Sequence, residues 1–158
     1  MRIAISGHRD LSIETAALVR SAIREILRPF GGDMVGVSCL APGSDQIFAD
    51  VVLELGGRLE AVVPTRQYGP GLPEVVRCGY DLRLGLASRV LRAPFDRPSP
   101  EAYASANALL LRDADVLVAV WDGRTARGTG GTADVVRDAR RLSIEVRIVW
   151  PEGALREP

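Results

Sequence analysis

Lysine is absent from this sequence of 158 residues, so all 20 of its basic side chains are arginines. A guanidinium group stays protonated and cannot replace a lysine amine as a nucleophile. The absence therefore excludes Schiff-base chemistry on lysine, the lysine-bearing phosphate loop of the P-loop NTPases, and the lysine of protein kinases.

Histidine is nearly absent as well, because the sequence has only His8. Metal sites built from two or three histidines are impossible within one such chain. A Ser-His-Asp or Cys-His catalytic system would have to use His8 itself. We expect no metal site and no required cofactor.

The sequence also lacks net charge, since 20 acidic residues balance the 20 arginines. Such a chain has no general electrostatic attraction to nucleic acid or to an anionic membrane, so any recognition of phosphate should be local. The longest apolar runs fall well short of the ~20 residues that span a bilayer. We therefore expect neither a nucleic-acid partner nor a membrane partner.

Cysteine is scarce too, with two in the sequence, and we expect no signal peptide. Cys39 falls in a strand-like stretch and Cys78 in a helix-like one. We expect two buried thiols in a reducing compartment rather than a disulfide, and hence a cytoplasmic protein.

What the sequence does contain is an alternation of short Val- and Ile-rich runs with longer amphipathic segments. This pattern is typical of strands that each return through a helix to a parallel sheet. At roughly 100 to 200 residues per domain, residues 1–158 should form one domain. The predicted fold is α/β, a three-layer α/β/α Rossmann-like doubly wound parallel sheet of five strands in the order 3-2-1-4-5. The predicted strands are Arg2–Ser6, Met34–Leu40, Leu59–Pro64, Asp115–Trp121 and Glu145–Trp150.

The first predicted helix covers residues 12–28, with Ser12 as its N-cap, and a second covers residues 45–55 and stops at two glycines. A third is predicted over residues 100–112. It lies in a long connection, residues 65–114, which also holds a helix-like stretch at residues 74–91.

Such a long connection suits the step at which the chain returns beside its first strand. The topological switch point then falls between the first and fourth strands. Ligands in sheets of this kind bind beyond the carboxyl ends of the strands at that point.

Two loops with glycines should meet at this switch point. One follows the first strand, and the other runs from Asp122 to Thr132 after the fourth. Gly130 and Gly131 would let a phosphate approach the backbone, Thr132 adds a hydroxyl, and the next helix presents free N–H groups. Arg124 and Arg127 could clamp an anion. The alternative is a surface loop with a glycine-capped helix entry.

The segment Gly128–Ala133 also matches the G-x-G-x-x-G/A pattern of dinucleotide-binding folds. In those folds the pattern follows the first strand and begins at the strand end. Here it follows the fourth strand after six intervening residues, so NAD binding is not favoured.

The loop after the second predicted strand has two interpretations. Gly43 allows a tight turn, Ser44 is a plausible N-cap, and the carboxylate of Asp45 suits the first turn of a helix. Asp45 could instead accept hydrogen bonds from sugar hydroxyls. His8 and Arg9 could contact a phosphate or a base, although a lone histidine in a loop is often a packed turn residue.

Three segments together resemble the SLOG superfamily, the Rossmann-like group that includes the Lonely-guy phosphoribohydrolases and the DNA-processing-protein-A fold. They are residues 7–11, residues 43–46, and residues 115–122 leading into 130–136. The similarity is strongest to small bacterial members of unknown substrate whose first loop reads Gly-His-Arg. It implies a nucleotide-type ligand and a homodimer or higher homo-oligomer. The candidate ligand-binding residues are Gly7, His8, Arg9, Gly43, Ser44, Asp45, Asp122, Gly123, Gly130, Gly131 and Thr132.

The sequence departs from the catalytic pattern of the Lonely-guy enzymes. Aligning their Gly-Thr pair on residues 131–132 puts Val135 where they carry a glutamate, and their Arg-Lys pair falls on Ala106 and Asn107. Nucleoside deoxyribosyltransferases, which the chain also resembles, need a glutamate at the same place. Asp134, one residue earlier, projects about 100° away around a helix.

These departures favour binding of a nucleotide or nucleotide-derived phosphorylated ligand, by a sensor or carrier without strong catalysis. The alternative is an N-glycosidase or deoxyribosyltransferase-like enzyme acting on a nucleoside monophosphate with Asp134, Asp122 or Asp45. A carrier of a phosphorylated cofactor such as molybdopterin is a third possibility.

Overall fold

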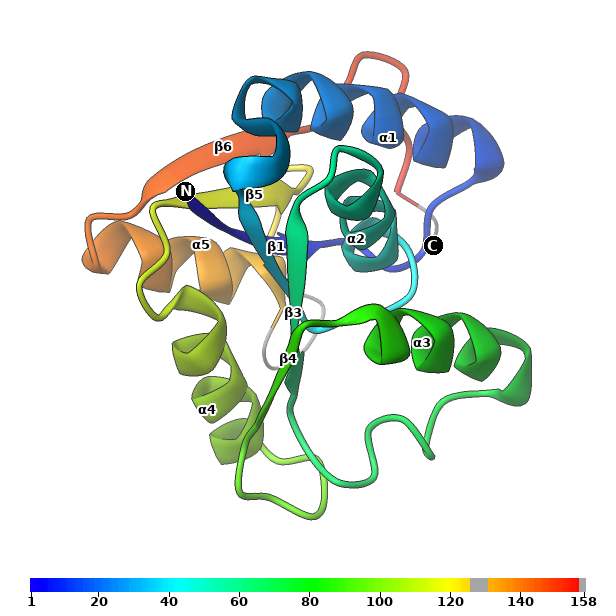
Figure 1. Cartoon of the computed structure of the whole chain (residues 1–158), viewed down its shortest axis with the longest axis vertical. Coiled ribbons are helices and arrows are strands. Elements are labelled where there is room, and N and C mark those ends of the chain that lie inside the picture. Colours follow the sequence, from blue (N-terminus) through cyan, green and yellow to red (C-terminus); the bar gives the residue numbers. More distant parts are fainter. Residues whose placement is uncertain (126–130, 157–158) are drawn as a thin grey trace.

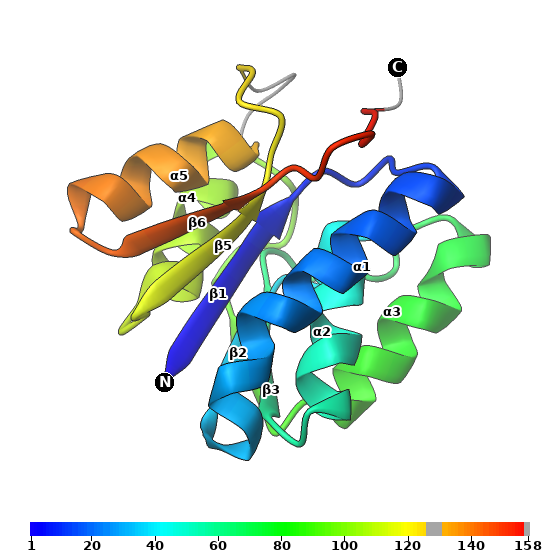
Figure 2. The same ribbon diagram turned by 90° about the horizontal axis from the view of Figure 1, so that it is seen from above.

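A computed structural model describes residues 1–125 and 131–156. Its centre is a parallel sheet of six strands in the order β4-β3-β2-β1-β5-β6 (Figures 1 and 2). Five of these correspond to the predicted strands and keep the predicted relative order. The strands are β1 (Arg2–Gly7), β2 (Val35–Ser38), β3 (Arg58–Val63), β4 (Arg89–Arg92), β5 (Val116–Val120) and β6 (Glu145–Val149).

The prediction of five strands was wrong, because β4 lies at the end of the stretch predicted as helical. Helix α3 (Glu74–Leu86) stops before it, and the backbone of Ala87 is extended. Ser88 then donates from both its N–H and its hydroxyl to the carbonyl of Leu59, at 2.8 and 3.0 Å. These bonds start β4 beside β3. With only four residues, Arg-Val-Leu-Arg, this edge strand has little of the apolar signal of the buried strands.

Helices cover both faces of the sheet, as the three-layer prediction requires. Figure 2 shows α1, α2 and α3 on one side and α4 and α5 on the other. Alternate residues of β1 serve the two layers: Ile3 and Ile5 pack in one core with α1 and α2, whereas Ala4 packs in another with α4 and α5. The helices are α1 (Ile13–Leu27), α2 (Ser44–Glu54), α3, α4 (Pro100–Leu111) and α5 (Thr132–Arg141), and a 3-10 turn, η1 (Arg28–Asp33), follows α1.

The helix starts agree with the sequence prediction in one case and differ in another. Ser12 caps α1 as predicted, accepting a hydrogen bond of 3.1 Å from the N–H of Thr15. Ser44, predicted as the cap of α2, is instead its first residue, and Gly43 is the N-cap. The hydroxyl of Ser44 is thereby free to bond elsewhere.

The last described residues, after β6, turn back over the start of α1. The hydroxyl of Thr15 accepts a 3.0 Å hydrogen bond from the N–H of Leu155. Leu11 and Arg156 form an isolated antiparallel β-bridge, and Figure 2 shows the returning segment. This return carries Arg156 to the carboxyl end of the sheet.

Three expectations concern composition rather than topology. Both cysteines are free, but only Cys39 is partly buried; Cys78 lies exposed on α3, so the prediction of two buried thiols was wrong for it. Among the described residues, no helix is long and apolar enough to cross a membrane. Nor does that part of the chain hold a cluster of three His, Cys, Asp or Glu residues suited to a metal ion.

Candidate functional site

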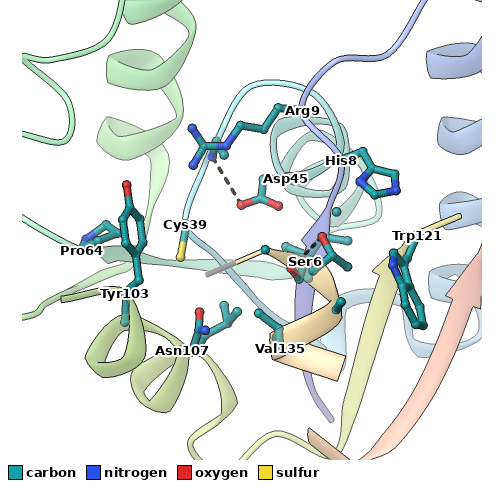
Figure 3. A pocket seen from close by; sticks show the side chains of 18 of the residues that line it. Ser6, His8, Arg9, Cys39, Asp45, Pro64, Tyr103, Asn107, Trp121 and Val135 are labelled. Carbon is teal, nitrogen blue, oxygen red and sulfur yellow. Dashed lines mark hydrogen bonds between the residues drawn. The ribbon is translucent and has the colours of Figure 1, made fainter. Parts of the chain in front are cut away.

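The carboxyl ends of β1 and β5 lie side by side, with Gly7 in register with Val120. A pocket of about 410 Å³ opens there and extends past the ends of β2 and β3 to α4 (Figure 3). The switch point predicted from the sequence is therefore hollow. The lining residues include Ser6, Gly7, His8, Arg9, Asp10, Cys39, Asp45, Pro64, Tyr68, Tyr103, Asn107, Trp121, Arg124, Gly131, Thr132, Val135 and Arg156.

His8 connects three segments that meet at the pocket. Its backbone N–H donates to the carbonyl of Val120, and its ring Nε2 accepts a 3.1 Å hydrogen bond from the backbone N–H of Asp122. Its carbonyl accepts two bonds from Ser44, one from Oγ at 2.8 Å and one from the backbone N–H at 3.2 Å. The ring also packs edge-on against Trp150. His8 thus joins the loops after β1 and β5 to the start of α2.

Gly7 and Gly43 are glycines because the loops approach each other closely. A Cβ at Gly7 would lie 2.5 Å from the Cβ of Ser44 and 2.7 Å from that of Val120. Gly43 has a positive φ of 84°, and a Cβ there would collide with the backbone of Arg9. Gly43 and Ser44, predicted to bind ligand, do not line the pocket and hold its wall in place.

The start of α5 forms one side of the pocket. Gly131 is the N-cap and has no side chain to accept the first N–H groups of the helix, which have no intrahelical partner. Thr132 is buried, and its Oγ1 accepts a 3.4 Å hydrogen bond from the hydroxyl of Ser6. N–H groups at a helix N-terminus favour an anion. Gly130 and Arg127, predicted to act with them, lie outside the described residues.

Three arginines reach this pocket from different segments. Arg9 follows β1, Arg124 follows β5, and Arg156 belongs to the returning C-terminal segment. Within the described part of the chain, the side chains of Arg9 and Arg124 form no ion pair, whereas Arg156 lies 3.4 Å from Asp122. Two guanidinium groups are thus available to an anionic ligand.

The pocket lining also includes a buried acidic residue, Asp45. Asp45 is 6% exposed, and its Oδ2 accepts a long hydrogen bond of 3.4 Å from the N–H of Ala41. Burial raises the pKa of this carboxyl to about 7, although Arg9 and the backbone N–H groups of Ala41 and Cys39 act to lower it. The Asp45 carboxyl therefore exchanges its proton near neutral pH. Figure 3 shows it below the side chain of Arg9, with the thiol of Cys39 nearby.

Helix α4 contributes a wall that the candidate residues did not include. Tyr103 and Asn107 stand one turn apart on it and line the pocket, with Pro64 beside Tyr103 in Figure 3. Within the described residues the amide of Asn107 has no hydrogen-bond partner, so it can offer a donor and an acceptor. The signal that could have identified this wall was the alignment that placed the enzymes' Arg-Lys pair on Ala106 and Asn107.

The three candidate catalytic carboxylates lie in different environments. Asp45 lines the pocket, whereas neither Asp122 nor Asp134 belongs to the lining. Asp134 pairs with Arg137 at 2.7 Å on α5. Burial alone would raise the pKa of Asp122, but the N–H of Arg124, His8 and Arg156 together hold it below its ordinary value. Val135 lines the pocket at the position that aligns with a glutamate of the Lonely-guy enzymes, which the sequence resembles.

Of the predicted ligand-binding residues, six line the pocket. The other described ones, Gly43, Ser44, Asp122 and Gly123, lie behind or beside it, and Gly130 is outside the described residues. Tyr68 also lines the pocket. The lining residues with a predicted binding role are Gly7, His8, Arg9, Asp45, Gly131 and Thr132.

Comparison with solved structures shows which known fold this is. DNA processing protein A from Streptococcus pneumoniae aligns over 96% of this chain and 51% of its own, with 20% identity and a TM-score of 0.68. The same protein from Helicobacter pylori, which binds single-stranded DNA, aligns over 98% and 67%, with 18% identity and a TM-score of 0.69. The chain shares the Rossmann-like fold of these proteins. The resemblance stated from its motifs is thus confirmed at the level of the fold.

The same fold occurs in the molybdenum cofactor carrier protein of Chlamydomonas reinhardtii. That protein aligns over 93% of this chain and 75% of its own, with 14% identity and a TM-score of 0.58. No protein-family model and no curated protein matches the chain. The chain spans about half the length of the Streptococcus pneumoniae protein and about two thirds of the Helicobacter pylori one.

Proposed function

We propose that the pocket binds a nucleotide or nucleotide-derived phosphorylated ligand, and that the protein is a sensor or carrier without strong catalysis. The observation that carries this proposal is that one pocket has a wall suited to a phosphate and another wall suited to a base. The start of α5, with Arg9 and Arg124, suits a phosphate. The face of α4 bearing Tyr103 and Asn107 suits a base, because an aromatic ring stacks on a base and an amide pairs with its edge.

The volume supports a ligand of this size, since sites for small molecules and cofactors measure roughly 300 to 1,000 Å³. Two described pocket positions lack the charged catalytic residues of the enzymes that the sequence resembles, which supports binding over catalysis. Val135 and Asn107 occupy pocket positions where the related enzymes carry charged catalytic residues. A carrier role also agrees with the fold shared with the molybdenum cofactor carrier protein.

Isothermal titration calorimetry with AMP, GMP, CMP and UMP tests the proposal, with Gly131→Asp as the diagnostic variant. Aspartate is a favoured N-cap and Gly131 has an ordinary φ of −69°, so the variant should fold. Its carboxylate occupies the helix N-terminus and repels phosphate, so binding should be lost. Gly131→Asn, which caps without charge, is the matched control and should keep part of the affinity. Absence of binding to all four nucleotides contradicts the proposal.

The enzyme alternative draws on one observation, the Asp45 carboxyl in the pocket with a pKa of about 7. A group that titrates near neutral pH can act as a general acid or base. Incubating the protein with the four monophosphates and separating free base by chromatography tests this alternative. Release of base that Asp45→Asn abolishes supports it over the sensor or carrier.

Binding of nucleic acid needs a separate test, because one protein of the same fold binds single-stranded DNA. The balanced charge of this chain predicts no such binding. Titration with a single-stranded oligonucleotide at low salt checks this prediction, and mass spectrometry of the purified protein checks for a retained cofactor.

A further inference from the structure

Tyr68 carries a hydroxyl that the protein itself does not use. The residue lines the pocket and is 8% exposed, and its Oη is buried without a hydrogen-bond partner in the described part of the chain. Leaving a buried polar group unsatisfied is destabilising. Phenylalanine would fill the same space without this cost. The hydroxyl therefore needs a reason outside the stability of the free protein.

Asp45 is a second pocket group with unused capacity. An ionised carboxylate can accept about four hydrogen bonds, whereas within the described residues the Asp45 carboxyl accepts from two backbone N–H groups, that of Ala41 at 3.4 Å and that of Cys39. It also has no ion-pair partner within 4.0 Å in that part of the chain. Its charge nevertheless acts on the Tyr68 hydroxyl, as does that of Arg9. Both residues line the same pocket.

The chemistry of these two groups limits which part of a nucleotide they can meet. A phosphate in direct contact with the Asp45 carboxylate is disfavoured because the two carry like charges. An apolar ring face would leave both polar groups unsatisfied. A pair of neighbouring hydroxyls fits, because each hydroxyl can donate to the carboxylate and also exchange a hydrogen bond with the phenol.

We propose that Asp45 and Tyr68 together bind the vicinal hydroxyl groups of a ribose, so that the pocket selects ribonucleotides over 2′-deoxyribonucleotides. This inference rests on the proposed function and specifies the sugar of its ligand. The phosphate then lies toward the start of α5 and the base toward Tyr103 and Asn107. Removing the 2′-hydroxyl leaves buried polar groups without a partner, which is the kind of mismatch that gives strong discrimination.

Calorimetry with AMP, GMP, CMP and UMP, each beside its 2′-deoxy counterpart, tests the proposal on the wild-type protein. We expect each ribonucleotide that binds to do so at least about tenfold more tightly than its deoxy form. Equal affinities for the two sugars overturn the inference and leave the proposed function intact. Absence of binding by all eight compounds overturns the proposed function itself.

Tyr68→Phe assigns the discrimination to its hydroxyl. We expect the ratio of ribose to deoxyribose affinity to fall by at least about threefold, with the melting temperature unchanged or raised because an unsatisfied group is removed. Tyr80→Phe is the matched control: Tyr80 packs edge-on against Tyr68 at 5.5 Å but does not line the pocket, so it should keep the wild-type ratio. An unchanged ratio in Tyr68→Phe, or a lowered melting temperature showing a structural role, overturns the assignment.

Discussion

Ser44 donates two hydrogen bonds to the carbonyl oxygen of His8, one from its Oγ at 2.8 Å and one from its N–H at 3.2 Å. The two residues are 36 positions apart and belong to the start of α2 and the loop after β1. This contact fixes the loop that carries Arg9 into the pocket. The pocket therefore depends on a buried residue that does not line it.

Replacing Ser44 by alanine tests this dependence. The backbone bond remains, but the buried carbonyl loses its shorter partner, so the free energy of unfolding should fall by about 1 to 2 kcal/mol. Urea denaturation measures the change. Ser21→Ala, at an exposed position on α1, is the control and should alter stability by less than about 0.5 kcal/mol. Equal stability of both variants would show that the Oγ bond contributes nothing.

Gly7→Ala should destabilise the protein by about 1 to 3 kcal/mol, because the added Cβ would lie 2.5 Å from Ser44 and 2.7 Å from Val120. Both neighbours belong to fixed elements and cannot retreat cheaply. Gly85→Ala is the matched control, since a Cβ there, inside α3, meets nothing within 4 Å. That change should stabilise by roughly 0.5 to 1 kcal/mol. Thermal denaturation of the two variants should therefore shift in opposite directions.

The strands show what a sequence of this kind predicts well. β1, β2, β3, β5 and β6 stood out because most of them are rich in Val and Ile and lie between helical layers. β4 did not, because it lies at the edge, has four residues, and begins and ends with arginine. Its pairing with β3 begins at the hydrogen bonds from Ser88 to Leu59. These two residues are 29 positions apart in the sequence, so no local pattern reveals the contact.

The site was predictable where it follows from topology. Carboxyl ends of parallel strands meet at one edge of the sheet, so the loops with His8 and Thr132 were expected together, and both line the pocket. Gly43 and Ser44 lie outside the pocket lining, and their support of the loop after β1 depends on a contact between distant segments that the sequence does not reveal. Tyr103 contacts the pocket only through the way α4 packs on the sheet, which its sequence does not specify.

Arg124→Gln should weaken binding of a nucleoside monophosphate by about threefold to tenfold, because it removes a guanidinium that faces the pocket and has no ion-pair partner in the described residues. The loss should be larger at low salt, since the side chain is exposed. Calorimetry with the tightest binder among AMP, GMP, CMP and UMP measures it. Arg137→Gln is the control: Arg137 pairs with Asp134 outside the pocket lining, so binding should not change. Equal effects of the two variants would argue against a local phosphate contact.

Asp45 should make the stability of the protein depend on pH. Its carboxyl ionises near 3.8 when unperturbed, but burial raises its pKa in the folded protein to about 7, in spite of the nearby Arg9. Between these values the folded protein holds a proton that the unfolded chain has released. Stability therefore falls as pH rises through this window, and the penalty is complete above about pH 7. A shift of three pKa units corresponds to about 4 kcal/mol.

Asp45→Asn removes this penalty because an amide stays neutral. The variant's free energy of unfolding, minus that of the wild type, should increase from about pH 4 to about pH 8 and then level off. Urea denaturation across this range measures it.

The groups facing Asp45 from neighbouring segments are Arg9, Cys39 and Tyr68. Burial holds the pKa values of the Cys39 thiol and the Tyr68 hydroxyl above their ordinary values, so neither titrates in this window. Asp10→Asn, at an exposed carboxyl of the same pocket, is the control and should follow the wild-type curve. Parallel curves for Asp45→Asn and the wild type would show that the buried carboxyl ionises as it does in the unfolded chain.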